Sequence, residues 1–129
     1  METIPSVLLV DDEPDFLDNL SLALEMAGCR PITATNGFEA LQVLQSQPVN
    51  LIVADINMPN MGGYQLYRLI RRNPCWTGIP FLFLTGYRFL SEAEIGYGKR
   101  LGVDGYLIKP ISVNDLLSAI KNKLKQAPT

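Results

Sequence analysis

The sequence predicts a single α/β domain: a doubly wound, five-stranded parallel sheet with strand order 2-1-3-4-5 and five helices. Two observations indicate this class. Short apolar runs alternate along the chain with longer segments in which apolar residues recur at helical spacing. The runs 51–54 and 79–84 contain no polar side chain, as expected of parallel strands that are buried on both faces. The chain has 129 residues, of which 47% are hydrophobic and 19% charged, so one ordinary core accounts for it.

Proline and glycine mark the ends of the elements in the first half of the chain. Pro14 suits the first position of a helix and Gly28 its stop, so the apolar residues that recur between them form one helical face. Pro31 restricts the next strand to the edge of the sheet or to a strand start. In chain order, the expected elements are the strand 6–10, the helix from Pro14 to Ala27, the strand 30–35, the helix from Gly37 to Gln45 and the strand 51–54.

The second half ends in the clearest helix of the chain. Leu116, Ile120 and Leu124 fall on one stripe at helical spacing, and Ser112 with Asp115 resembles a capping box at its start. In chain order, the expected elements of this half are the helix 64–72, the strand 79–84, the strand 103–108 and the helix from Ser112 to Leu124.

One further helix is expected between the last two strands, in the segment 86–101, and its sequence is unfavourable. Gly96 and Gly98 fall inside it, and each interior glycine costs roughly 1 kcal/mol relative to alanine. We therefore expect the helix through Ser91 to Leu101 to be short, shifted or mobile.

Composition restricts the functions open to the chain. We expect one domain over residues 1–129, with a core of about 6–125 and a tail or the start of a linker at 126–129. The net charge of −2 does not indicate the basic surface that direct binding of nucleic acid requires. No apolar run is long enough to span a membrane. The N-terminus lacks the features of a leader peptide, so we expect a cytoplasmic protein. We also expect it to be a monomer or a weak dimer. No histidine is present, which excludes Ser-His-Asp and Cys-His catalysis and histidine metal sites.

Residues of complementary chemistry directly follow the strongest strands. Asp11 and Asp12 follow the first strand, Asp55 the third, Thr85 the fourth and Lys109 the fifth. Ligands of open parallel sheets bind at the carboxyl ends of the strands, near the point where the strand order reverses. The order 2-1-3-4-5 places strands one and three side by side at that point. The three aspartates should therefore converge there, with Thr85 and Lys109 closing the far side.

A cluster of three aspartates requires a neutralising partner. Two like charges about 4 Å apart repel by roughly 4 kcal/mol at an effective dielectric constant of about 20. Shared protons, the Lys109 ammonium or a divalent cation could each offset this repulsion. Carboxylates without histidine or thiolate favour Mg²⁺, or else Mn²⁺, over zinc. A carboxylate, a cation, a hydroxyl and a lysine around one cavity are the groups that phosphoryl transfer to an aspartate needs.

Each of these residues also has an ordinary structural interpretation. Acidic residues before a helix often only cap it, which would account for Asp11 and Asp12. Asp55 could be a turn residue, and Tyr106 inside the fifth strand is more often a core residue than a switch. These interpretations leave unexplained why four strand ends carry complementary chemistry at the same edge of the sheet.

Four segments closely resemble, in order and spacing, the signature segments of the receiver domain of two-component response regulators. They are VLLVDDEP, LIVADINMPNMGG, FLFLTG and GVDGYLIKP, and the resemblance extends from about Val7 to Leu124. It implies the flavodoxin-like fold of that family, which agrees with the sheet expected above, and a role in phosphorelay signal transduction rather than an enzymatic activity.

The resemblance implies a role for each residue of the acidic site. Asp55 corresponds to the phosphoacceptor, which takes its phosphoryl group from a histidine kinase or a phosphotransfer protein. Asp12 would bind Mg²⁺ directly, and Asp11 would assist, commonly through water. Asp55 itself and the backbone carbonyl of Asn57 would complete the metal ligands.

The resemblance also implies a switch. Thr85 would hydrogen-bond the phosphoryl group and Lys109 would pair with it, and the Lys109-Pro110 peptide corresponds to the usual cis peptide of the family. Tyr106 corresponds to the switch aromatic, which rotates inward when Thr85 is drawn towards the phosphate. The surface of the fourth helix, the fifth strand and the fifth helix would then change for a downstream protein target or a fused output domain.

Two other functions remain open at this point. A receiver-like module could bind partners without regulated phosphorylation, and the glycines of the expected fourth helix favour it. A small Mg²⁺ phosphatase of the haloacid dehalogenase type would place its nucleophile after strand one and an Asp two residues later, but Glu13 occupies that second position.

Overall fold

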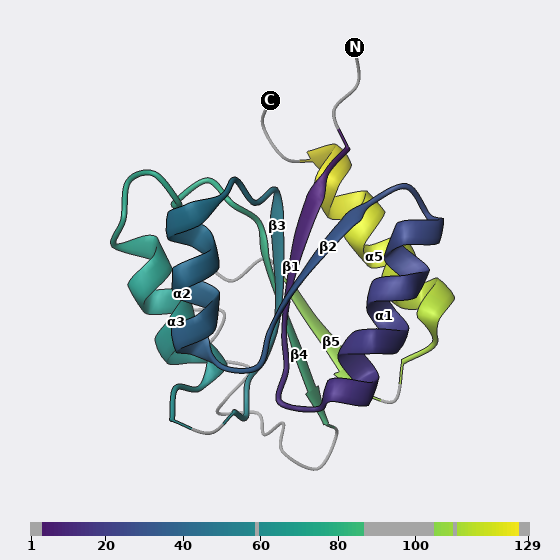
Figure 1. Ribbon diagram of the computed structural model, residues 1–129, viewed down its shortest axis with the longest axis horizontal. Coiled ribbons are helices and arrows are strands. Elements are labelled where there is room, and N and C mark those ends of the chain that lie inside the picture. The colour runs from purple at the N-terminus through teal and green to yellow at the C-terminus, as the bar shows by residue number, and fades with distance from the viewer. Residues whose placement is uncertain (1–3, 59, 87–104, 110, 127–129) are drawn as a thin grey trace.

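The protein is a parallel sheet covered by helices, in the computed structural model that describes residues 4–58, 60–86, 105–109 and 111–126 (Figure 1). The strand order is β2-β1-β3-β4-β5, which confirms the predicted flavodoxin-like topology. The described residues contain four helices, and the segment 91–101, where the glycine-containing helix is expected, lies outside them. The elements are β1 (Ser6–Val10), α1 (Pro14–Met26), β2 (Arg30–Ala34), α2 (Gly37–Ser46), β3 (Leu51–Asp55), α3 (Gly63–Arg71), β4 (Phe81–Gly86), β5 (Gly105–Lys109) and α5 (Val113–Gln126).

The three central strands are buried on both faces. Every residue of β1 and β3 is buried, and so are the first five residues of β4. Because both faces are covered, these strands are continuous apolar runs and do not alternate with polar residues. β2 pairs only with β1 and lies at one edge of the sheet, which is the position that Pro31 allows.

Two apolar cores lie on opposite faces of the sheet. Figure 1 shows α2 and α3 on one side and α1 and α5 on the other. Successive residues of a strand point to opposite faces, so Leu8 of β1 packs in the core of α2 and α3, whereas Leu9 packs in the core of α1 and α5. The helices contribute buried residues at helical spacing, namely Leu17, Leu20 and Leu24 of α1, Ala40 and Leu44 of α2, Leu66 and Ile70 of α3, and Leu116 and Ile120 of α5.

The boundaries of β4 differ from the sequence prediction. The strand begins at Phe81 and not at residue 79, because a turn precedes it in which the amide of Ile79 donates to the carbonyl of Trp76 at 3.1 Å. It ends at Gly86, so Thr85 lies inside the strand and not after its end. Thr85 is consequently held by the sheet itself.

The last helix agrees with its predicted start. α5 begins at Val113, directly after Ser112, whose hydroxyl oxygen accepts a hydrogen bond from the amide of Asp115 at 3.0 Å. This confirms the predicted cap. β5 begins at Gly105 where the expected strand began at 103, and residues 103 and 104 lie outside the described part of the chain.

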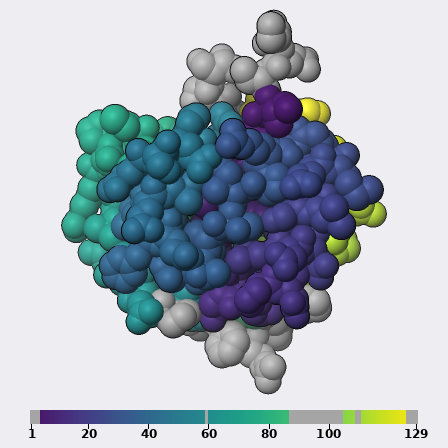
Figure 2. Space-filling view, in the orientation of Figure 1, coloured from purple at the N-terminus to yellow at the C-terminus, as the bar shows by residue number. Residues whose placement is uncertain are grey.

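The N-terminal part of the chain dominates one side of the molecule. In Figure 2, purple and blue residues, which include α1 and α2, occupy most of the face in view. No helix within the described residues has the length and the apolar composition that crossing a bilayer requires.

Candidate functional site

Three carboxylates meet at the carboxyl ends of β1 and β3. One oxygen from each of Asp11, Asp12 and Asp55 lies within 4.8 Å of the other two, as the strand order predicted. Asp11 is 2% exposed and Asp55 is 7% exposed, whereas Asp12 is exposed to solvent. The cluster therefore combines two buried carboxylates with one that is open to incoming ligands.

Both buried carboxylates close a turn. The Oδ1 of Asp11 accepts a hydrogen bond from the amide of Glu13 at 2.9 Å, and the Oδ1 of Asp55 accepts one from the amide of Asn57 at 3.0 Å. In such Asx turns an aspartate bonds the backbone two residues further on, which holds its carboxylate in one orientation. The interpretation of Asp55 as a turn residue is therefore correct but incomplete, because the same carboxylate belongs to the cluster.

Asp11 and Asp12 do not occupy the N-cap position of α1. Glu13 is the N-cap residue of α1, and its side chain makes no capping hydrogen bond. Pro14 occupies the first turn, so Asp11 and Asp12 stand outside the helix. Their carboxylates extend from the end of β1 and not from the helix terminus.

Backbone contacts fix the position of Asp55. The amide of Ile56 donates to the carbonyl of Leu84 in β4 at 3.1 Å, and the carbonyl of Ile56 accepts from the amide of Gly63 at 2.9 Å. A Cβ atom at Gly63 would lie 2.5 Å from the carbonyl oxygen of Asp55, so a glycine is needed where α3 begins. The start of α3 is thus packed directly against the backbone of Asp55.

The acidic cluster is suited to a small, hard cation. Two oxygens on opposite sides of Mg²⁺ are about 4.2 Å apart, since each Mg–O distance is about 2.1 Å. The carboxylate oxygens of the cluster, within 4.8 Å of one another, are close to that spacing. Oxygen donors without nitrogen or sulfur favour Mg²⁺ or Mn²⁺ over zinc.

Thr85 lies one strand away from the cluster. It is fully buried, and it follows Leu84, which is in register with Asp55. Its hydroxyl donates to the carbonyl of Gly86 at 3.5 Å, which is so long for a hydrogen bond that a better acceptor would readily replace it. The hydroxyl is therefore only weakly bound within the protein.

The remaining predicted residues are placed only in part. Lys109 is the last residue of β5 and is in register with Gly86, which puts its backbone at the same edge of the sheet. Pro110 lies outside the described residues, so the predicted cis peptide is not tested. Asn57 is exposed and holds Asp55 through its amide, while the role of its carbonyl as a metal ligand stays a prediction.

Tyr106 is held by two aromatic residues. Its ring stacks on that of Phe83 with a centroid distance of 5.6 Å, and its hydroxyl lies 2.6 Å from the hydroxyl of Tyr64 in α3. The role of Tyr64 could not be predicted from the sequence, because the two tyrosines are 42 residues apart and no local pattern connects them.

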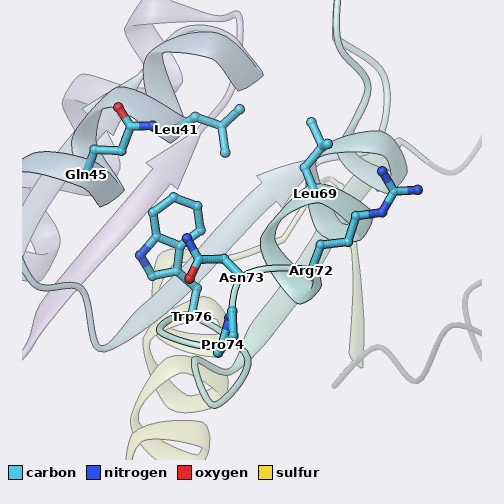
Figure 3. Close-up of a pocket in the computed structure, with 7 residues that line it drawn as sticks. All are labelled: Leu41, Gln45, Leu69, Arg72, Asn73, Pro74 and Trp76. Carbon is cyan, nitrogen blue, oxygen red and sulfur yellow. The ribbon is translucent and has the colours of Figure 1, made fainter.

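A separate hollow lies between α2 and α3 (Figure 3). Helices in this fold run antiparallel to the strands, so the hollow, at the C-terminal ends of these helices, lies away from the acidic cluster. Its volume is about 500 Å³, and none of its lining residues carries a carboxylate. These residues are Leu41, Gln45, Leu69, Arg72, Asn73, Pro74 and Trp76.

Comparison with known proteins identifies close relatives of this chain. Residues 7–121 match the family model described as the response regulator receiver domain. Protein PilG of Pseudomonas aeruginosa is 36% identical over 115 residues, which are 89% of this chain and 84% of that protein. A probable cyclic di-GMP phosphodiesterase of Vibrio cholerae is 35% identical over 120 residues, which are 93% of this chain but 26% of the relative, so the chain spans about a quarter of that protein.

Solved structures show the same similarity. A CheY-like response regulator receiver domain protein from Methanospirillum hungatei superposes with a TM-score of 0.88 at 30% identity, covering 96% of this chain and 96% of that chain. The chemotaxis response regulator CheY4 of Vibrio cholerae superposes with a TM-score of 0.85 at 31% identity, covering 94% of this chain and 99% of that chain.

Proposed function

Because the chain belongs to the family of response regulator receiver domains, we propose that Asp55 is the residue that accepts a phosphoryl group in two-component signal transduction. The main support is the acidic cluster. Asp55 is buried, is oriented by the amide of Asn57, and lies with an oxygen within 4.8 Å of those of Asp11 and Asp12. A carboxylate held in this way is prepared to act as a nucleophile, since little ordering is left to occur during the reaction.

Phosphoryl transfer to Asp55 forms one bond and breaks another. A carboxylate oxygen of Asp55 attacks phosphorus, and the bond from phosphorus to an imidazole nitrogen of the donor breaks, with that nitrogen keeping the electron pair. These 129 residues contain no histidine, so the imidazole lies outside them, in a histidine kinase or a phosphotransfer protein. The product is an acyl phosphate on Asp55.

The transfer depends on a divalent cation held by the acidic cluster. Asp12 and Asp55 would bind it directly, Asp11 would bind it through water, and the backbone carbonyl of Asn57 would complete the protein ligands. Mg²⁺, or Mn²⁺ in its place, offsets the charge of the carboxylates and of the phosphoryl oxygens when bound. The Asx turns of Asp11 and Asp55 hold these two carboxylates in fixed orientations, so they would be ready to bind the cation.

The phosphoryl group then acts on the neighbouring strands. It adds negative charge and strong acceptor oxygens beside β4. The buried hydroxyl of Thr85 exchanges its long contact with the Gly86 carbonyl for a phosphoryl oxygen, and Lys109 supplies the compensating positive charge. Tyr106 rotates inward when Thr85 is drawn towards the phosphoryl group, which alters the surface of β5 and α5.

A protein partner binds that surface and responds to its change. It is either a separate target or an output domain fused to the receiver, as the greater length of some relatives suggests. The chain itself acts in the cytoplasm as a monomer or weak dimer, has no enzymatic output of its own and makes no direct contact with nucleic acid.

Intact mass after incubation with Mg²⁺ and acetyl phosphate tests the proposal. We expect one phosphoryl adduct on the wild-type protein and none on Asp55→Asn or on the metal-free sample. The matched control is Asp15→Asn, which changes an exposed aspartate in the first turn of α1 and should leave the adduct intact. An adduct on Asp55→Asn would contradict the assignment. A folded, Mg²⁺-binding protein that gains no adduct would instead be an interaction module that works without phosphorylation.

A further inference from the structure

We propose that Tyr64 is a positioning residue that connects the backbone of Asp55 to Tyr106 on β5, by a route that does not pass through Thr85. The inference rests on the proposed function, because it concerns how a phosphoryl group on Asp55 reaches the surface of β5. Three structural steps carry it: the attachment of α3 to Asp55, the contact between the two tyrosines, and the position of β5 in the sheet.

The first step is the attachment of α3 to Asp55. The amide of Gly63 donates to the carbonyl of Ile56 at 2.9 Å, and the Cα of Gly63 lies so close that an added Cβ would be 2.5 Å from the Asp55 carbonyl oxygen. Tyr64 is the next residue of α3. A movement of the Asp55 backbone is therefore transmitted to Tyr64, because no space between them absorbs it.

The second step is the contact between the two tyrosines. The hydroxyls of Tyr64 and Tyr106 are 2.6 Å apart, which is short for two hydroxyl groups and requires one to donate to the other. Both rings also pack on Phe83, with centroid distances of 4.8 Å from Tyr64 and 5.6 Å from Tyr106. Phe83 is fully buried in β4 and is in register with Tyr106, so its ring is a fixed surface on which both tyrosine rings pack. The ring of Tyr106 is thus fixed at its face by Phe83 and at its hydroxyl by Tyr64.

The third step is the position of β5 at the edge of the sheet. β5 pairs with β4 alone, so its side-chain contacts carry more of its attachment than those of a central strand do. Tyr106 is half-buried, and Ile108 on the same strand face is 41% exposed. A shift of Tyr64 therefore changes a surface that a partner can contact.

The hydroxyl of Tyr64 is the group to remove, since its ring has a separate role against Phe83. Tyr64→Phe keeps the ring and deletes the hydroxyl. One neutral hydrogen bond changes an equilibrium by roughly two- to tenfold. We therefore expect the population of Tyr106 oriented towards residue 64, relative to the population rotated away from it, to fall by that factor in the variant. The control is Tyr67→Phe in the same helix, whose ring also packs on Phe81 and Phe83, at 5.2 and 5.9 Å.

Fluorine NMR of protein labelled with 3-fluorotyrosine measures the orientation of Tyr106. The chain has five tyrosines, and the Tyr106 signal is assigned by its loss in Tyr106→Phe. Spectra are recorded before and after treatment with Mg²⁺ and acetyl phosphate, and intact mass on the same samples reports the adduct. Dispersed fluorine signals show that each variant is folded.

The outcomes separate this inference from the proposed function. We expect the Tyr106 signal to be displaced in unmodified Tyr64→Phe, and its change on phosphorylation to be less than half that of the wild type and of Tyr67→Phe. A Tyr106 signal in unmodified Tyr64→Phe that coincides with the wild type would overturn the inference. A displaced signal with a phosphorylation response of full size would also overturn it, because Tyr64 would then be only structural. If the wild type gains no adduct, the proposed function fails, while the unmodified samples still decide whether Tyr64 positions Tyr106.

Discussion

Substitution of Gly63 by alanine should disturb the acidic site through the backbone of Asp55. An alanine Cβ at this position would lie 2.5 Å from the carbonyl oxygen of Asp55 and 3.0 Å from the Cα of Ile56. Both neighbours are backbone atoms, which cannot rotate away as the end of a side chain can. Either α3 moves outward or the end of β3 shifts, and in both cases the 2.9 Å bond from the amide of Gly63 to the carbonyl of Ile56 is weakened.

Two opposing effects set the magnitude for Gly63→Ala. Steric strain of this kind costs about 1–3 kcal/mol, and weakening one backbone hydrogen bond costs about 1 kcal/mol more. Alanine in a helix gains at most about 1 kcal/mol over glycine. We therefore expect a net loss of about 1–3 kcal/mol in the free energy of unfolding. A domain with a typical stability of about 5–15 kcal/mol stays folded under that loss, so the phosphorylation of the variant can still be measured.

Urea unfolding followed by tryptophan fluorescence measures this loss, because Trp76 is the only tryptophan of the chain. The matched control is Gly78→Ala, where an added Cβ meets nothing within 4 Å. We expect the control to stay within about 0.5 kcal/mol of the wild type or to gain slightly. We also expect Gly63→Ala to accept the phosphoryl group from acetyl phosphate more slowly than the control. Equal stability of the two variants would refute the close packing of α3 on Asp55.

Three further predictions concern charge and caps. Asp12→Asn removes one of three clustered carboxylates, so calorimetric titration should show Mg²⁺ affinity at least about tenfold weaker, while urea unfolding of the metal-free protein should show no loss of stability. Ser112→Ala deletes the acceptor of the Asp115 amide and should lower the free energy of unfolding by about 1 kcal/mol, and an unchanged urea midpoint would contradict the cap. The hydroxyl and the amide of Thr35 both donate hydrogen bonds to the Glu39 carboxylate, and these bonds, the hydroxyl's most of all, lower the pKa of Glu39. The contact therefore stabilises the fold at pH values above the ordinary pKa of Glu, and this stabilisation is lost as the pH falls through the lowered pKa of Glu39. Thr35→Val should therefore bring the pKa of Glu39 closer to its ordinary value in a carboxyl NMR titration, and an unchanged pKa would contradict the hydroxyl contact.

The topology could be predicted because its signals are local. The buried strands are continuous apolar runs, and Pro31 restricts one strand to an edge. Given the strand order, the convergence of Asp11, Asp12 and Asp55 follows from the rule that the carboxyl ends of parallel strands share one edge. The structure confirms that convergence with carboxylate oxygens within 4.8 Å of one another.

Other features depend on contacts between segments far apart in the sequence. Thr85 was expected after the end of β4, but the pairing of Gly86 with Lys109 extends the strand past it, and single-strand hydrophobicity carries no information on that pairing. The partnership of Tyr64 with Tyr106 joins residues 42 positions apart. The contact between Gly63 and the carbonyl of Asp55 is likewise a property of the folded backbone alone.

Chemical identification of the phosphorylated residue tests the central claim most directly. Borohydride reduces the acyl phosphate of an aspartate to the alcohol of homoserine, which then marks the site permanently for peptide mass mapping. After treatment with Mg²⁺ and acetyl phosphate, we expect homoserine at position 55 and aspartate unchanged at positions 11 and 12. Homoserine at position 11 or 12, or a phosphoryl group that borohydride does not remove because it is bound to a serine or threonine, would contradict the assignment of Asp55 as the phosphoacceptor.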